Sequence, residues 1–232
     1  MTTHAREWIK TVGRQIEHPI QRLLELQKLL TIKHGDFQNE FVEQLMCIEC
    51  IHENSKVLEI GGNIGRTTVI INTMLNNSKH LVTFESDPDI AEKLKENLQL
   101  NGYDSHVEAG AISTRPLIQK LNTWDTKPLE TPTIPEGWKL VTTTSYKDII
   151  KKYGLEFDAL VIDCEGAFYY ILYDEPEILD NIKVIIIEND FQEFYQKMYV
   201  DQQFAARGFT RVAAFRGDWG PCIDYFYEIW RR

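Results

Sequence analysis

The stretch Val57–Thr68 reads VLEIGGNIGRTT and decides the fold of the chain. An apolar run ends at Ile60, a glycine-rich turn follows, and a helical pattern begins near Arg66. A glycine turn between a strand and a helix lets a ligand approach the backbone closely. The stretch therefore predicts an α/β fold that holds a nucleotide-type ligand at this turn.

The rest of the chain has the alternating pattern of the same fold. After KVLEI (56–60), short apolar runs at 80–85, 105–110, 157–163 and 183–188 alternate with helical stretches, which indicates a parallel sheet covered on both faces. Runs at 208–215 and 222–230 flank an RGDWGP turn and predict a terminal antiparallel hairpin. The Pro- and Thr-rich stretch between Ala111 and Lys147 is expected to be an insertion or an edge strand.

The first part of the chain has a different pattern. Apolar residues recur at helical spacing up to Ile51, with a break at 34–37. We therefore expect an N-terminal helical cap over residues 1–52. Residues 53–232 are expected to form one α/β domain, since 232 residues suit a single core.

Charge and hydropathy limit the possible partners and location. The formal net charge is −10 and Lys and Arg are scattered, which argues against binding a nucleic acid through its phosphates. A charged-then-apolar leader and a run of eighteen apolar residues are both missing from the sequence. We therefore expect a cytoplasmic protein without a membrane span.

The charge beside the glycine turn indicates which cofactor binds there. The dinucleotide fingerprint G-x-G-x-x-G aligns with Gly61, Asn63 and Arg66, so two of its three glycines are missing. Glu59 at the strand end is unfavourable beside a pyrophosphate but favourable beside a cation. S-adenosylmethionine carries a sulfonium and an ammonium and no phosphate. The sequence therefore favours S-adenosylmethionine over a nicotinamide dinucleotide.

The next two strand ends predict the rest of the cofactor site. Glu85, at the end of the second run, is placed to accept hydrogen bonds from a ribose diol, although it could be an ordinary loop acid. Asp87 and Pro88 should begin a helix as N-cap and first helical residue. The small residues at the end of the third run, Ala109, Gly110 and Ala111, would leave room for an adenine ring, or form a simple tight turn.

Carboxylates at the fourth and fifth strand ends predict the chemistry. Asp163 and Glu165 could accept a proton or bind a cation; alternatively, Asp163 caps a helix and Glu165 lies in its first turn. Glu188 and Asn189 should lie beside Asp163, because their strands are neighbours. These oxygens would suit magnesium or manganese, or Glu188 could bind the substrate or a backbone amide.

Taken in order, VLEIGGNIG, TFESDP, VIDCEGAF and IIIEND resemble the motifs of the FkbM-type methyltransferase family. The resemblance covers roughly residues 35–230. It implies a seven-stranded class I methyltransferase fold, S-adenosylmethionine as donor and a hydroxyl as acceptor. By position, Asp163, Glu165 and Gly166 would form its DxEG-type motif. The candidate cofactor residues are Glu59, Gly61, Gly62, Asn63, Gly65, Glu85, Ser86, Ala109, Gly110, Ala111 and Asp163.

The expected function is O-methylation of a sugar or glycan hydroxyl, with Asp163 or Glu165 assisting loss of its proton. One alternative is a divalent-metal-dependent O-methyltransferase of a small non-sugar natural product, using Mg²⁺ or Mn²⁺ at Asp163, Glu188 and Asn189. Another is a nicotinamide-dependent oxidoreductase. A cofactor-binding module without acceptor chemistry is a further alternative, against which the presence of Asp163 and Glu165 argues.

Overall fold

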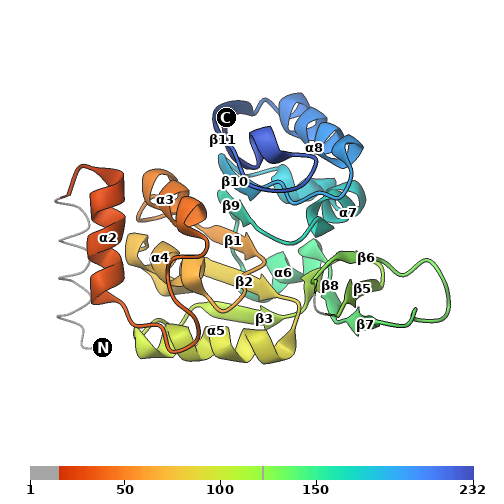
Figure 1. Ribbon diagram of the computed structural model, residues 1–232, viewed down its shortest axis with the longest axis horizontal. Coiled ribbons are helices and arrows are strands. Elements are labelled where there is room, and N and C mark those ends of the chain that lie inside the picture. The colour runs from red at the N-terminus through yellow and green to blue at the C-terminus, as the bar shows by residue number, and fades with distance from the viewer. Residues whose placement is uncertain (1–15, 122) are drawn as a thin grey trace.

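The computed structural model describes residues 16–121 and 123–232. Its main sheet is built from β1 (Val57–Ile60), β2 (Leu81–Glu85), β3 (His106–Ala109), β9 (Ala159–Ile162), β10 (Val184–Glu188), β11 (Thr210–Phe215) and β12 (Tyr227–Arg231). The strand order is β11-β12-β10-β9-β1-β2-β3 (Figure 1). β12 runs antiparallel to β10 and β11, and the other neighbouring strands pair in parallel. The seven-stranded, mostly parallel sheet and its C-terminal hairpin are thus confirmed.

Helices cover both faces of this sheet. They are α2 (Pro19–Leu29), α3 (Phe41–Cys50), α4 (Arg66–Met74), α5 (Pro88–Leu100), α6 (Tyr146–Tyr153), α7 (Ala167–Asp174) and α8 (Phe194–Ala206). Successive strand residues point to opposite faces. Leu58 and Ile60 therefore pack in one core with α6, α7 and α8, whereas Val57 packs in another with α3 and α4. Burial on both faces explains why the strand sequences are apolar throughout.

The N-terminal segment contributes two helices in the described region, α2 and α3, separated by the predicted break. Residues 1–15 of the expected cap lie outside the described residues. α3 packs against α4 and β10, and its residues Met46 and Cys47 belong to the core on that face of the sheet. α3 is therefore joined to the α/β domain through a shared core.

Residues 111–144 form two small sheets, as expected for an insertion. β4 (Ala111–Ile112) pairs with β8 (Thr143–Thr144), and β5 (Leu117–Lys120) pairs with β6 (Thr126–Pro128) and β7 (Trp138–Val141). Figure 1 shows the β5–β7 sheet projecting from the body beside the ends of β1, β2 and β3. The insertion is thus positioned to border a site at those strand ends.

The last predicted strand is shorter than expected. The run 222–230 was predicted as extended, but its first part contains the short 3-10 helix η3 (Ile223–Tyr225), and β12 begins at Tyr227. Asn189 explains the difference. Its Nδ2 donates to the carbonyl of Tyr225 at 2.7 Å and its backbone N donates to that of Phe226 at 2.6 Å, so the chain reaches the edge of β10 only there.

The helix start predicted at Asp87 is confirmed. Asp87 is the N-cap of α5, and its side chain accepts hydrogen bonds from the backbone N–H groups of Asp89 and Ile90. Pro88 occupies the first helical position. Across the described part of the chain, the helices are too short or too polar to span a bilayer.

Candidate active site

A cavity opens where β1, β2 and β9 end, at the edge predicted to hold the ligand. Gly61 and Asn63 of the glycine turn line it, as do Glu85, Asp163 and Glu165. The structure thus brings the principal donor-side and chemical candidates into one cavity. Its other lining residues are Ile60, Phe84, Ser86, Ile90, Gly110, Ala111, Gln119, Trp124, Thr126, Cys164, Ala167 and Ile171.

Backbone contacts hold the glycine turn tightly against the sheet. The N–H groups of Gly61 and Gly62 both donate to the carbonyl of Phe84, at 2.9 and 2.8 Å. Gly61 has φ +91°, and a Cβ there would lie 1.5 Å from the carbonyl oxygen of Asp163. The space that a side chain would need at Gly61 is therefore filled by the protein's own backbone. The sequence pattern alone predicts only that the missing side chain leaves this space to a ligand.

Glu85 joins the turn to the next helix. Its two carboxylate oxygens accept hydrogen bonds from the backbone N–H groups of Asn63 and Asp87, at 2.9 and 2.8 Å. Burial raises the pKa of this carboxyl, although these hydrogen bonds oppose the shift. Oε1 also accepts a hydrogen bond from Oγ of Ser86 at 3.4 Å. Oε2 keeps a further lone pair, so Glu85 can still accept a hydrogen bond from a ligand in the cavity.

Four candidate cofactor residues, Glu59, Gly62, Gly65 and Ala109, do not line the cavity. Glu59 is 2% exposed, accepts a hydrogen bond from Thr68 at 2.7 Å, and lies beneath the turn; burial raises its pKa to about 7. Gly62 faces inward, since a Cβ there would lie 2.3 Å from Oγ1 of Thr83. Ala109 is exposed. Any effect of Glu59, Gly62 or Ala109 on cofactor binding would therefore be indirect, through the conformation of the glycine turn or of the end of β3.

The remaining cofactor candidates lie in the glycine turn and in the segments that follow β2 and β3. Gly65 is the N-cap of α4 with φ +91°, and it packs against Leu94. Gly110 and Ala111 line the cavity where an adenine wall was predicted. Ser86 accepts a hydrogen bond from Nε2 of Gln119 at 2.5 Å. The assignment of these residues to the cofactor stays a prediction.

Asp163 and Glu165 follow β9, and neither caps α7. The N-cap of α7 is Gly166, whose N–H donates to Oδ1 of Asp190 at 2.9 Å. The capping interpretation of Asp163 is therefore wrong, because Gly166 occupies the cap position. Both acids line the cavity. Burial raises the pKa of Glu165 to about 7 and holds that of Asp163 well above its usual range.

The fifth strand end brings Glu188 to Asp163, as predicted, but adds an unexpected partner. Carboxylate oxygens of Glu43, Asp163 and Glu188 lie within 4.8 Å of one another. Burial raises the pKa of Glu188, and the neighbouring Asp163 and Glu43 raise it further. Asn189 is 1% exposed and uses its amide nitrogen on Tyr225, while its Oδ1 has no hydrogen-bond partner.

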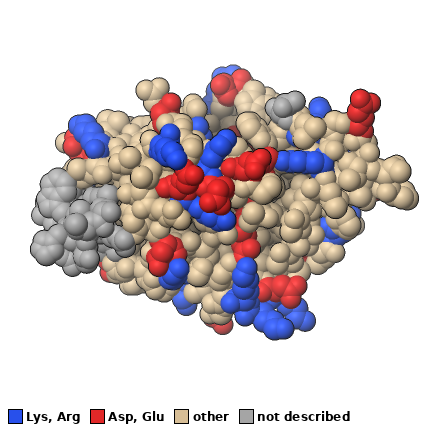
Figure 2. All heavy atoms as spheres, turned by 90° about the horizontal axis from the view of Figure 1, so that it is seen from below, with Lys and Arg blue, Asp and Glu red and all other residues tan. Residues whose placement is uncertain are grey.

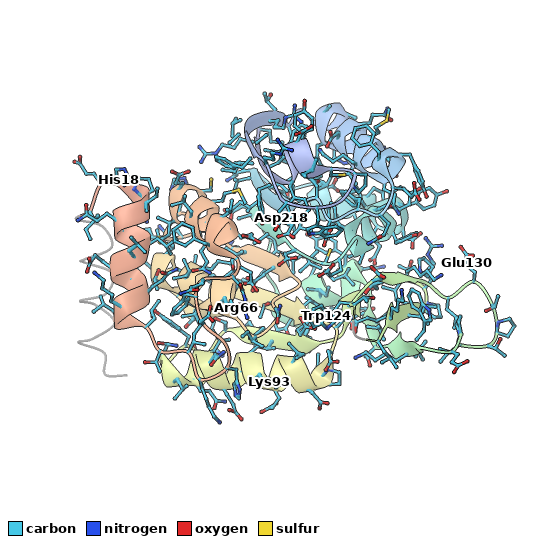
Figure 3. The ribbon with its side chains drawn as sticks, in the orientation of Figure 1. His18, Arg66, Lys93, Trp124, Glu130 and Asp218 are labelled. Atoms are coloured by element: carbon cyan, nitrogen blue, oxygen red, sulfur yellow. The ribbon has the colours of Figure 1, made fainter. Side chains whose placement is uncertain are left out.

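Sequence reasoning missed three residues of this region. Glu43 comes from α3, and its signal was a charged residue one helical turn before buried Cys47. Gln119 and Trp124 come from the insertion, whose sequence carried no sign of its position. Figure 3 shows Trp124 between the strand ends and the small sheet, with Glu130 at the sheet's outer side.

Comparisons with solved structures identify the fold. A ribosomal protein L11 methylase from Lactobacillus delbrueckii subsp. bulgaricus superposes with a TM-score of 0.52 at 12% identity, covering 87% of this chain and 81% of that one. An O-methyltransferase from Bacillus cereus in complex with SAH superposes with a TM-score of 0.50 at 16% identity, covering 91% and 89%. These superpositions show that the chain has the class I S-adenosylmethionine-dependent methyltransferase fold.

The family follows from the sequence match. Residues 59–228 match the methyltransferase FkbM domain, so the chain belongs to the FkbM methyltransferase family and is a methyltransferase. The curated proteins contain no match to it. The nicotinamide-dependent oxidoreductase considered from the sequence is thereby set aside.

The residues present fit S-adenosylmethionine, the donor of this class. Glu85 is only 7% exposed, and its Oε2 keeps a lone pair that can accept a hydrogen bond from a ribose hydroxyl. Oε1 of Gln119 is buried without a hydrogen-bond partner in a residue that lines the cavity, and a bound adenine amine would satisfy it. Gly110 and Ala111 present little side-chain bulk to a ring. These residues would hold the donor along the strand ends.

Proposed function

We propose that the chain transfers a methyl group from S-adenosylmethionine to a hydroxyl of a sugar or glycan. The observation that carries the proposal is that Glu165 and Asp163 line the same cavity as Gly61 and Glu85. An acidic side chain is therefore available in the cavity that would hold the donor. Acceptor chemistry and donor binding share one enclosed space.

The donor supplies an electrophilic methyl group, and the protein must position and deprotonate the acceptor hydroxyl. Glu165 is the candidate general base, because it lines the cavity and is not engaged by a helix cap. Asp163 is the second candidate. A general base placed within hydrogen-bond reach of the hydroxyl typically contributes about 10²–10⁴-fold to the rate.

A sugar acceptor is supported by Trp124. This side chain is 46% exposed, lines the cavity, and lies between the strand ends and the small sheet (Figure 3). An exposed aromatic face beside carboxylates suits a ring that is apolar on one face and carries hydroxyls at its edge. The tyrosine rings of α7 and α8 pack on one another instead of facing the cavity lining. The ring centroids of Tyr169 and Tyr199, for example, lie 5.3 Å apart.

The charge distribution supports a small-molecule or glycan acceptor over a nucleic acid. On the face shown in Figure 2, Lys and Arg side chains lie among Asp and Glu side chains. With a formal net charge of −10, the chain would repel a polyanion unless its basic residues were segregated.

The test is methyl transfer from labelled S-adenosylmethionine to a panel of mono- and oligosaccharides, with phenolic natural products and a transfer RNA as further arms. We expect label in a carbohydrate. Glu165→Gln should lower kcat about 10²–10⁴-fold while donor affinity is unchanged. Glu130→Gln is the control, because Glu130 is an exposed acid in the loop between β6 and β7 and does not line the cavity. Label only in the RNA or the phenolic arm would refute the sugar acceptor.

A further inference from the structure

Three carboxylates from distant parts of the chain meet beside the cavity, which Asp163 lines. Glu43 lies in the first turn of α3, Asp163 follows β9, and Glu188 ends β10. One oxygen from each lies within 4.8 Å of the other two. Three unit charges at this separation repel one another strongly when they are shielded from water.

No side-chain cation of the described residues pairs with these carboxylates. Within residues 16–121 and 123–232, the ion pairs formed by Lys, Arg and His do not include Glu43, Asp163 or Glu188. The nearby Arg66 is engaged by Glu40 at 2.8 Å instead. The cluster is therefore uncompensated by side-chain cations.

Glu43 provides a second, independent observation. This residue is 4% exposed, and its Oε2 is buried without a hydrogen-bond partner. Buried carboxylate oxygens without partners are costly unless a ligand or a proton satisfies them. Oε2 of Glu43 can therefore bind a ligand, because none of the described residues donates a hydrogen bond to it.

We propose that Glu43, Asp163 and Glu188 bind a divalent cation, Mg²⁺ or Mn²⁺. Carboxylate oxygens are the ligands that these hard cations prefer. Three protein ligands leave the other octahedral positions to water, as is usual for Mg²⁺, whereas Ca²⁺ takes six to eight oxygens. The cluster contains no imidazole or thiolate, which zinc would favour.

The position of this site has a structural consequence. A cation there ties α3 to the ends of β9 and β10, and Asp163 places it at the wall of the cofactor cavity. The site differs from the one expected from sequence, since Glu43 takes the place assigned to Asn189. It does not depend on the identity of the acceptor, because binding of the cation needs neither donor nor acceptor.

The experiment uses the full chain after treatment with chelator and without donor or acceptor. Mn²⁺ is titrated in while the electron paramagnetic resonance signal of the free ion is followed, and Mg²⁺ is used as competitor. We expect saturable binding of one Mn²⁺ per chain. Glu43→Gln and Glu188→Gln should each weaken binding at least about tenfold, since each removes a charged ligand.

Glu49→Gln is the matched control, because Glu49 lies on the same helix but is exposed. It should bind Mn²⁺ like the unaltered chain. In a thermal melt, Mg²⁺ should raise the Tm of the unaltered chain and of Glu49→Gln but not that of Glu43→Gln. Failure to bind Mn²⁺ at millimolar concentration would overturn the proposal, and so would equal affinity for Mn²⁺ in Glu43→Gln and Glu49→Gln. The repulsion among the three carboxylates would then be relieved by a shared proton. Neither result bears on methyl transfer to a sugar.

Discussion

Substituting Gly61 by alanine tests whether the turn is shaped by the protein's own backbone. A Cβ at this position would lie 1.5 Å from the carbonyl oxygen of Asp163 and 2.5 Å from its carbonyl carbon. Gly154, the C-cap of α6, is the matched control. Its φ is also positive, at +63°, but a Cβ there meets no atom within 4 Å.

The two substitutions separate backbone strain from collision. A positive φ costs an alanine about 1–2 kcal/mol, and this is the whole expected loss for Gly154→Ala. Gly61→Ala adds a collision with backbone, and forced repacking costs about 1–3 kcal/mol or more. We therefore expect a total loss of about 2–5 kcal/mol for Gly61→Ala.

The free energy of unfolding is measured in urea for both variants, and donor affinity by calorimetry. Because relief of the collision must displace Asp163, Gly61→Ala should also weaken binding of S-adenosylmethionine at least about tenfold. Gly154→Ala should bind normally. Equal losses of stability at the two glycines would show that the close approach of Asp163 is not a constraint.

Three further predictions concern buried carboxylates. Glu85→Ala should lower donor affinity about tenfold or more, because one or two charge-assisted hydrogen bonds to the ribose are lost; unchanged affinity in calorimetry would contradict the ribose assignment. The pKa of Glu59 is raised from 4.5 to about 7 by burial, so its neutral form favours folding below about pH 4.5 and this contribution is lost as the pH rises through 7. The unfolding free energy of Glu59→Gln minus that of the unaltered chain should thus grow by on the order of 3 kcal/mol between about pH 4.5 and pH 8, and a flat difference would refute the shift. Lys197, 2% exposed, binds Glu228, which is 0% exposed, at 2.8 Å; Lys197→Met should cost about 3–5 kcal/mol in chemical denaturation, whereas a loss below about 1 kcal/mol would show that Arg211 alone compensates Glu228.

The parts of the site that could be predicted from sequence share one physical origin. Gly61, Glu85 and Asp163 each follow an apolar run, and parallel strands end at the same edge of a sheet. Their meeting in one cavity follows from the order of the runs alone. The same reasoning brought Glu188 beside Asp163.

The parts that could not be predicted depend on how separate elements pack. Glu43 reaches Asp163 only because α3 presents that side of the helix to β10, which periodicity does not specify. Trp124 and Gln119 reach the cavity through an insertion whose strands pair only with one another. The 3-10 turn before Tyr227 depends on hydrogen bonds from Asn189, so the run 222–230 looked extended throughout.

The insertion is fastened to several separate parts of the domain. Gln119 of β5 bonds Ser86, and Lys139 of β7 pairs with Asp87, both directly after Glu85. Arg115 pairs with Asp174 of α7, and Asp125 accepts a hydrogen bond from Gln192 before α8. A chimera that exchanges residues 113–142 between relatives should therefore carry positions 86, 87, 174 and 192 with them, because an insertion grafted without its anchors would lose its orientation over the cavity.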